Sequence, residues 1–168
     1  SCKITFMIIH VKNKNTLIID DFILRCCIGK NGITSYKEEG DFSTPRGLFR
    51  LKKLYFRKDR LNSPRCKIKK KVITKSLAWC DDSTQKKYNE EIQVFNKKSR
   101  EKFFRIDNKY DYLITINHNE KKIPYKGSAI FLHLTDDYKP TAGCIALKRK
   151  DFEILLKLID KNTKIQIG

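Results

Sequence analysis

Features that define several protein classes are missing from this chain of 168 residues. No run approaches the roughly 18 consecutive apolar residues of a membrane helix, so we expect no membrane span. The apolar stretch at residues 4–11 is short and is followed by no small-residue cleavage site, which argues against a signal peptide. There are also no repeats, no low-complexity tract and no linker, so one domain is expected over residues 1–168.

Cysteine motifs are equally scarce, although the chain has six cysteines. None forms a CxxC pair, which argues against a zinc ribbon or a thioredoxin-like motif. Cys26 and Cys27 are adjacent in a strand-like run and point to opposite faces, so they are poor disulfide partners. A chain of this length and apolar content needs no disulfides, so we expect reduced thiols and a cytoplasmic location. A periplasmic location is the alternative if a leader has been removed.

Metal-ligand patterns are missing as well. The pair Asp81-Asp82 lacks the alternating oxygen ligands of a calcium loop, so neither a metal nor a cofactor is expected. In contrast, 37 Lys and Arg residues outnumber 19 Asp and Glu residues and give a net charge of +18. Lysine is spread along the chain, and the one dense cluster, at residues 65–71, has no interleaved aromatics, so nucleic acid is not an expected partner. The charge fits steering toward anionic peptides or glycans.

Short β-rich runs separated by turn residues dominate the chain and predict a mainly β domain. The expected architecture is a sandwich or a partly open barrel with a few short helices. Helical spacing is clearest at residues 151–159, with Asp151 near the start, and shorter helical segments are expected near Ser83 and at 101–104. The expected strands are residues 4–11, 16–20, 22–28, 48–56, 112–116, 129–132 and 163–167.

Chemistry concentrates in residues 127–147, where a histidine ends one expected strand and a cysteine begins another. The polar loop between His133 and Cys144 is long enough to bring the two side chains together. A thiolate is a nucleophile, and an adjacent imidazole lowers the thiol pKa and acts as a general base. Gly143 leaves the surrounding backbone N–H groups uncrowded, as an oxyanion hole requires. The competing interpretation is a buried structural thiol beside a core histidine.

The loop at residues 29–47 carries Glu38, Glu39, Asp41 and Arg46. It is either a solvated surface loop or a wall of the active site, since binding residues concentrate on loops held by a rigid scaffold.

These motifs resemble one known family. Residues 141–145, TAGCI, with His133 upstream, resemble the active-site signature of the L,D-transpeptidase (YkuD-type) family, which is a His, a loop and then Ser/Thr-His-Gly-Cys. The resemblance to a compact branch of that family extends over nearly the whole chain. It includes EGDFSTPRG at 39–47, WCDD at 79–82, YN at 88–89, RIDNKYD at 105–111 and GSAIFLH at 127–133.

The resemblance implies a β-sandwich-like fold and an enzyme that acts on the tetrapeptide stems of peptidoglycan or on muropeptides. Cys144 would attack the carbonyl of the diamino acid, usually meso-diaminopimelate, release D-alanine and keep a thioester. An amine acceptor would then give an L,D cross-link, and water would give a tripeptide, which is L,D-carboxypeptidase activity. By position, His133 would be the base, the N–H groups of Gly143 and Cys144 would hold the oxyanion, and the Leu134 carbonyl would orient the imidazole.

The chain also departs from the family pattern. Ala142 stands where many members have His, Ala146 where many have Arg or Asn, and Leu134 where Gly is frequent. Two side chains that contact substrate or tune the site are therefore missing, and Arg46 is the candidate for the missing positive charge. Thr141, Arg46 and Leu134 are the expected substrate-binding residues.

Other classes of function stay open at this stage. A catalytically idle, basic module would bind a wall polymer or nucleic acid. A redox thiol protein would form a disulfide between Cys144 and Cys80 or Cys66. The motif does not separate transpeptidase from carboxypeptidase, and a monomer is expected.

Overall fold

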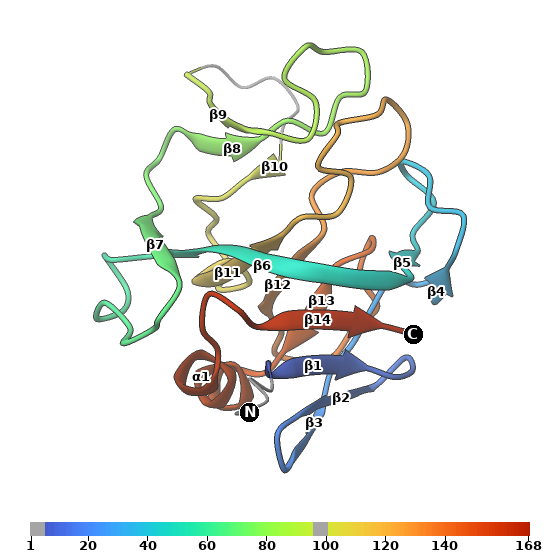
Figure 1. Ribbon diagram of the computed structural model, residues 1–168. Coiled ribbons are helices and arrows are strands. Elements are labelled where there is room, and N and C mark those ends of the chain that lie inside the picture. Colours follow the sequence, from blue (N-terminus) through green and yellow to red (C-terminus); the bar gives the residue numbers. More distant parts are fainter. Residues whose placement is uncertain (1–5, 96–100) are drawn as a thin grey trace, which may run out of the picture.

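The computed structural model describes residues 6–95 and 101–168, which form fourteen strands and one helix (Figure 1). In chain order the elements are β1 (Ile8–Val11), β2 (Thr16–Ile19), β3 (Phe22–Arg25), β4 (Ile33–Thr34), β5 (Thr44–Pro45), β6 (Gly47–Phe56), β7 (Lys69–Val72), β8 (Leu77–Trp79), β9 (Glu91–Gln93), β10 (Glu101–Lys102), β11 (Tyr112–Ile116), β12 (Phe131–Leu134), β13 (Ile145–Leu147), α1 (Arg149–Leu158) and β14 (Lys164–Ile167).

One large sheet organises the described residues. Its strands follow the order β13-β12-β11-β6-β14-β1-β2-β3, and β7 pairs with β6 beside this path. The long strand β6 crosses the middle of the molecule, pairing with β14 through its first half and with β11 and β7 through its second half (Figure 1). Smaller sheets, β10-β8-β9 and β4-β5, flank it.

The large sheet nearly closes on itself. Cys27, just after β3, forms an antiparallel bridge with Ala146 of β13, and each residue donates its N–H to the other's carbonyl at 2.9 Å. This bridge joins the two ends of the strand order. The expected mainly β fold is confirmed, in the form of a nearly closed sheet.

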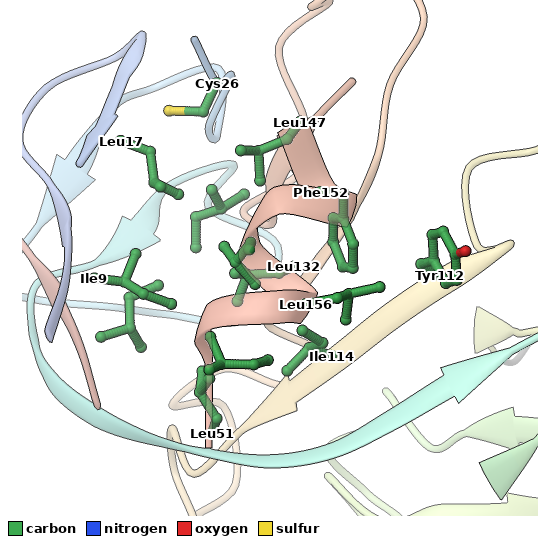
Figure 2. Packing of buried hydrophobic residues seen from close by; sticks show 14 of the residues in the cluster. Ile9, Leu17, Cys26, Leu51, Tyr112, Ile114, Leu132, Leu147, Phe152 and Leu156 are labelled. Atoms are coloured by element: carbon green, nitrogen blue, oxygen red, sulfur yellow. The ribbon is translucent and has the colours of Figure 1, made fainter. Parts of the chain in front are cut away.

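The main core lies between this sheet and α1. Apolar residues recur at Phe152, Leu155, Leu156 and Ile159, which places them on one side of the helix. Figure 2 shows Phe152 and Leu156 pointing toward Leu132 and neighbouring residues of the sheet. Burying a side chain of this size contributes about 1.5–3 kcal/mol. The helix predicted at 151–159 is confirmed and begins two residues earlier.

A second buried cluster, rich in aromatic rings, lies on the opposite face of β11 and β12. Phe103 is its centre, with ring centroids 5.0 Å from Tyr55 and 5.5 Å from Phe131, both in edge-to-face geometry. Cys144 and Trp79 pack against this cluster. The aromatic layer therefore forms a rigid floor beneath the region that holds His133 and Cys144.

Some local predictions are wrong. Residues 101–104 form no helical turn, because Glu101 and Lys102 pair with β8 while Phe103 is fully buried. Ser83 begins no helix either: the carboxylate of Asp82 accepts hydrogen bonds from the Thr84 N–H and hydroxyl, which fixes a turn. The polar segment 62–74 also contains a strand that the sequence did not reveal: β7 pairs with β6 and is flanked by the buried Ile68 and Ile73.

Candidate active site

His133 and Cys144 lie on neighbouring parallel strands. His133 is inside β12 and pairs with Ala146 of β13, while Cys144 immediately precedes β13. Because side chains alternate along a strand, His133, Ala146 and Cys144 project from the same face of the sheet. The strand expected at residues 129–132 is displaced by two residues, so the histidine does not end a strand but lies within it.

A cleft of about 330 Å³ opens over this face. Both His133 and Cys144 line it, as do Thr141, Gly143 and Leu134, so five of the six expected site residues are brought together. Its charged lining residues are Lys37, Glu39, Asp81, Glu101, Arg105, Lys109, Asp137 and Lys139.

The Cys144 thiol is held by backbone groups rather than by His133. Its Sγ donates to the carbonyl oxygen of Ala129 at 3.1 Å and accepts from the N–H of Phe131 at 3.3 Å. No hydrogen bond joins it to His133 in the part of the chain that the structure describes. Burial raises the pKa of the thiol to about 12, so the expectation of a thiol pKa lowered by the histidine is wrong for this state. Cys144 is therefore a neutral thiol at rest.

The imidazole of His133 is fixed as a neutral base. Its Nδ1 lies 2.8 Å from the Leu134 carbonyl oxygen, which is the contact expected from the sequence. Since a carbonyl oxygen only accepts, Nδ1 carries the proton and Nε2 is left with a lone pair. Burial lowers the pKa of His133 to about 4. The Tyr110 ring, with its centroid 5.2 Å from the imidazole centroid, supports the ring from one side.

Thr141 shapes the turn that presents the cysteine. Its hydroxyl donates to the Cys144 carbonyl oxygen at 2.6 Å and accepts from the Gly143 N–H at 3.1 Å. The expected oxyanion donor at Gly143 is therefore already engaged by Thr141. The N–H of Cys144 donates no hydrogen bond to any residue within 6–95 or 101–168, so it is the donor left for an oxyanion.

Gly143 is required by close packing at this turn. Its φ is +147°, a region that side chains rarely adopt, and a Cβ there would lie 2.8 Å from the carbonyl oxygen of Ser43. The Thr44 hydroxyl donates to the Gly143 carbonyl at 2.8 Å. The loop at residues 29–47 is thus clamped against the cysteine turn.

This loop is in part the expected wall of the cleft. Lys37, Glu39 and Gly40 line the cleft, but Arg46 does not. Arg46 is exposed, its N–H bonds the Thr34 carbonyl at 2.8 Å, and its guanidinium lies against Gly168. The structure therefore does not bring Arg46 to the substrate.

Cationic residues from another segment reach the cleft instead. Arg105 and Lys109 line it, and their positive charges act on His133. Arg105 is neutralised by Asp107, at 2.8 and 2.7 Å, whereas the ammonium of Lys109 has no ion-pair partner among the described residues. Neither Arg105 nor Lys109 was among the expected site residues, because nothing in the spacing of residues 105–111 shows which of their charges face a cleft.

Across residues 6–95 and 101–168, no three His, Cys, Asp or Glu side chains gather as a metal site. None of the described helices combines the length and the hydrophobicity needed to cross a membrane. Cys144 and Cys66 form no disulfide with a described residue, so the disulfide that a redox protein would need is not seen.

Comparison with known proteins gives a family match. The sequence matches the family described as YkuD, L,D-transpeptidase catalytic domain, over residues 5–167. No curated protein matches it.

Two solved structures have a similar fold. The helical cell shape determining protein Pgp2 from Campylobacter jejuni has a TM-score of 0.53 at 16% identity, covering 97% of this chain and 47% of that one. Bd1075 from Bdellovibrio bacteriovorus has a TM-score of 0.51 at 16% identity, covering 98% of this chain and 48% of that one. This chain therefore spans about half the length of either relative, and at such identity the likeness concerns the fold.

Proposed function

This chain belongs to the YkuD family of L,D-transpeptidase catalytic domains, and from that premise we propose a cysteine acyl-enzyme with Cys144 as nucleophile and His133 as base. Membership implies a cell-wall enzyme of the L,D-transpeptidase type. The observation that carries the residue assignment is that both side chains project from one face of paired strands into the same cleft.

The resting geometry suggests how the reaction begins. The thiol first leaves the Ala129 carbonyl by a side-chain rotation, and Nε2 of His133 then takes its proton. The thiolate attacks the carbonyl carbon between the diamino acid and D-alanine of a tetrapeptide stem. The resulting oxyanion accepts a hydrogen bond from the Cys144 N–H, where each such donor is worth about 3–4 kcal/mol in other enzymes.

In the second half of the step, His133 passes the proton to the leaving group. The imidazolium of His133 donates it to the nitrogen of D-alanine as the C–N bond breaks, which leaves a thioester on Cys144. An acceptor amine attacks that thioester to form an L,D cross-link, or water attacks it to leave a tripeptide; in either case the attacking group gives a proton to His133, the C–S bond breaks, and that proton restores the Cys144 thiol. Both outcomes use the same acyl-enzyme, so they differ in what enters the cleft after D-alanine leaves.

Lys109 supports this orientation of the substrate. The leaving amine must lie beside His133, and the terminal carboxylate of D-alanine is one carbon away from it. The unpaired ammonium of Lys109 is within electrostatic reach of His133 and lines the same cleft. We assign Lys109, in place of Arg46, to that carboxylate.

The direct test is a tetrapeptide muropeptide incubated with wild type and with Cys144→Ala. Loss of D-alanine release in the variant, together with a thioester adduct mass on the wild-type protein, is the expected result. Release by Cys144→Ala equal to wild type would refute the mechanism. Adding an acceptor amine then separates the two activities, since a cross-linked product identifies a transpeptidase and a tripeptide alone a carboxypeptidase. We propose that the enzyme acts in the cytoplasm, in the recycling of cell-wall fragments.

A further inference from the structure

The carboxylate of Glu39 lines the cleft and is held there by hydroxyl groups. Its neighbour Lys37 pairs with Asp41 at 2.5 Å, and across the cleft Arg105 pairs with Asp107 at 2.7 Å. The Glu39 carboxylate forms no ion pair with any described residue, although the chain carries a net charge of +18. Other carboxylates without an ion pair to a described residue, such as Asp20, Glu38 and Asp160, do not line the cleft, so Glu39 is distinguished by its position.

Hydroxyl groups fix this carboxylate in place. The Ser128 hydroxyl lies 2.9 and 3.0 Å from its two oxygens, and the Tyr88 hydroxyl donates to Oε2 at 2.8 Å. Tyr88 is itself fully buried and accepts from the Gly127 N–H at 3.0 Å. An ionised carboxylate offers about four acceptor positions, so these donors leave room for a further ligand.

A hydrogen-bond partner of this carboxylate is adjacent in sequence to a residue that holds the nucleophile. Ser128 precedes Ala129, whose carbonyl accepts the Cys144 thiol, and Glu39, Ser128 and Ala129 all line the cleft. Lys109, beside His133, belongs to a different strand-connecting segment. Glu39 thus lines the cleft on the side of the Ala129 carbonyl, and Lys109 lines it on the side of His133.

We propose that Glu39 is the binding site for the primary ammonium group at the end of the substrate's diamino acid side chain. This inference rests on the proposed function, because that side chain belongs to the residue whose carbonyl Cys144 attacks. The ammonium donates charge-assisted hydrogen bonds to Glu39, which are stronger than neutral ones. An acceptor amine fits this position less well, because it must lose its proton to react and a carboxylate favours the protonated form.

The proposal makes Glu39 a determinant of substrate choice. A hydrogen bond between charged groups contributes about 1.5–3 kcal/mol, so a stem with a free side-chain ammonium should be preferred about tenfold or more. A stem whose side-chain amine is acetylated keeps the scissile bond and the terminal carboxylate but loses the charge. Comparing the two stems isolates the ammonium from every other part of the substrate.

The experiment measures kcat/KM for D-alanine release from both stems without an acceptor, in wild type and in Glu39→Gln. Wild type should prefer the free-amine stem about tenfold, and Glu39→Gln should process both alike. Glu38→Gln is the matched control, since Glu38 is exposed and does not line the cleft, and it should keep the wild-type preference. Ser128→Ala, which removes one hydroxyl that holds the carboxylate, should reduce the preference partly.

A purely structural role for Glu39 gives a different pattern. Glu39→Gln would then lower kcat/KM on both stems by the same factor and retain the preference, which would overturn the proposal. Wild type that processes both stems equally would also overturn it while leaving the acyl-enzyme mechanism intact. Release by Cys144→Ala would instead overturn the proposed function itself. If Glu39→Gln unfolds, the partial loss of preference in Ser128→Ala decides the matter, and unchanged preference there counts against the proposal.

Discussion

The thiol of Cys144 donates its hydrogen bond to the carbonyl oxygen of Ala129, 3.1 Å away. Ala129 adopts a φ of +54°, which costs a non-glycine residue about 1 kcal/mol. Asn89 helps to hold it there, since its side-chain oxygen accepts from the Ala129 N–H at 3.3 Å and from the Trp79 indole at 2.9 Å. The structure therefore maintains a strained backbone conformation at Ala129, with its carbonyl oxygen opposite the thiol.

The first prediction concerns thiol reactivity without substrate. Burial raises the pKa of Cys144 to about 12, so the thiolate fraction rises with pH throughout the range below that value. Alkylation of Cys144 by iodoacetamide, followed by peptide mass spectrometry, should accelerate continuously from pH 7 through pH 9. His133→Gln should leave this profile nearly unchanged because the two side chains are not bonded at rest. A rate that levels off below pH 8 would contradict the resting state described above.

The second prediction concerns the pH dependence of catalysis. Burial lowers the pKa of His133 to about 4, so the imidazole is neutral and able to accept a proton at all pH values well above 4. The acidic limb of kcat/KM should therefore lie near pH 4 rather than near the ordinary histidine value of about 6.5. His133→Gln should reduce kcat about 10²–10⁴-fold, as expected for loss of a general base. An acidic limb near pH 6.5 would show that the histidine is more solvated than the structure indicates.

Thr141 gives a third prediction. Its hydroxyl joins the Cys144 carbonyl to the Gly143 N–H, so Thr141→Val should destabilise the fold by about 1–3 kcal/mol and reduce kcat. Thr141→Ser retains the hydroxyl and is the matched control. Urea unfolding and D-alanine release measure the two effects. If Thr141→Val matched the serine variant in both assays, the hydroxyl would have no part in presenting the cysteine.

A fourth prediction compares two glycines with positive φ. A Cβ at Gly143 would meet the Ser43 carbonyl at 2.8 Å, whereas a Cβ at Gly40 has no neighbour within 4 Å. Gly40→Ala should cost only the backbone strain, about 1 kcal/mol, and Gly143→Ala should cost at least about 2–4 kcal/mol and abolish D-alanine release. Equal losses of thermal stability in the two variants would show that the turn at Gly143 shifts to accommodate a Cβ, and would contradict the prediction.

Lys109 gives a fifth prediction. Lys109→Met should raise KM for a tetrapeptide with a free terminal carboxylate about tenfold, because it removes the unpaired ammonium beside His133. Arg46→Met, at the residue that lies outside the cleft, should leave KM unchanged. A substrate amidated at its terminal carboxylate should be insensitive to Lys109→Met. The reverse pattern, with Arg46→Met raising KM, would restore the assignment made from the sequence.

The sequence was informative where one local pattern determines the structure. The fully buried strand 112–116 was predicted at its observed bounds, because a strand buried on both faces reads as a nearly continuous apolar run. The spacing of Phe152, Leu155 and Leu156 likewise predicted α1. His133 and Cys144 were expected to meet because they flank one loop, and they do line one cleft.

The features that were missed depend on contacts between distant segments. Residues 101–104 were misjudged because Phe103 packs on Tyr55 and Phe131, which no local pattern reveals. Arg46 was chosen over Lys109 because a sequence shows charge but not the direction of a side chain. The engagement of the Gly143 N–H by Thr141 requires knowledge of the turn geometry, and the raised pKa of Cys144 requires knowledge of its burial.

The bond from the Thr44 hydroxyl to the Gly143 carbonyl spans 99 positions of the chain and has a consequence for the order of folding. Contacts of such separation form late, because a long loop must close before they contribute. The turn that presents Cys144 is therefore completed only after the first and last thirds of the chain have met. During synthesis, from the N-terminus onward, the protein should acquire a reactive geometry at this cysteine only after residues 141–147 have been made and have met the segment around Thr44.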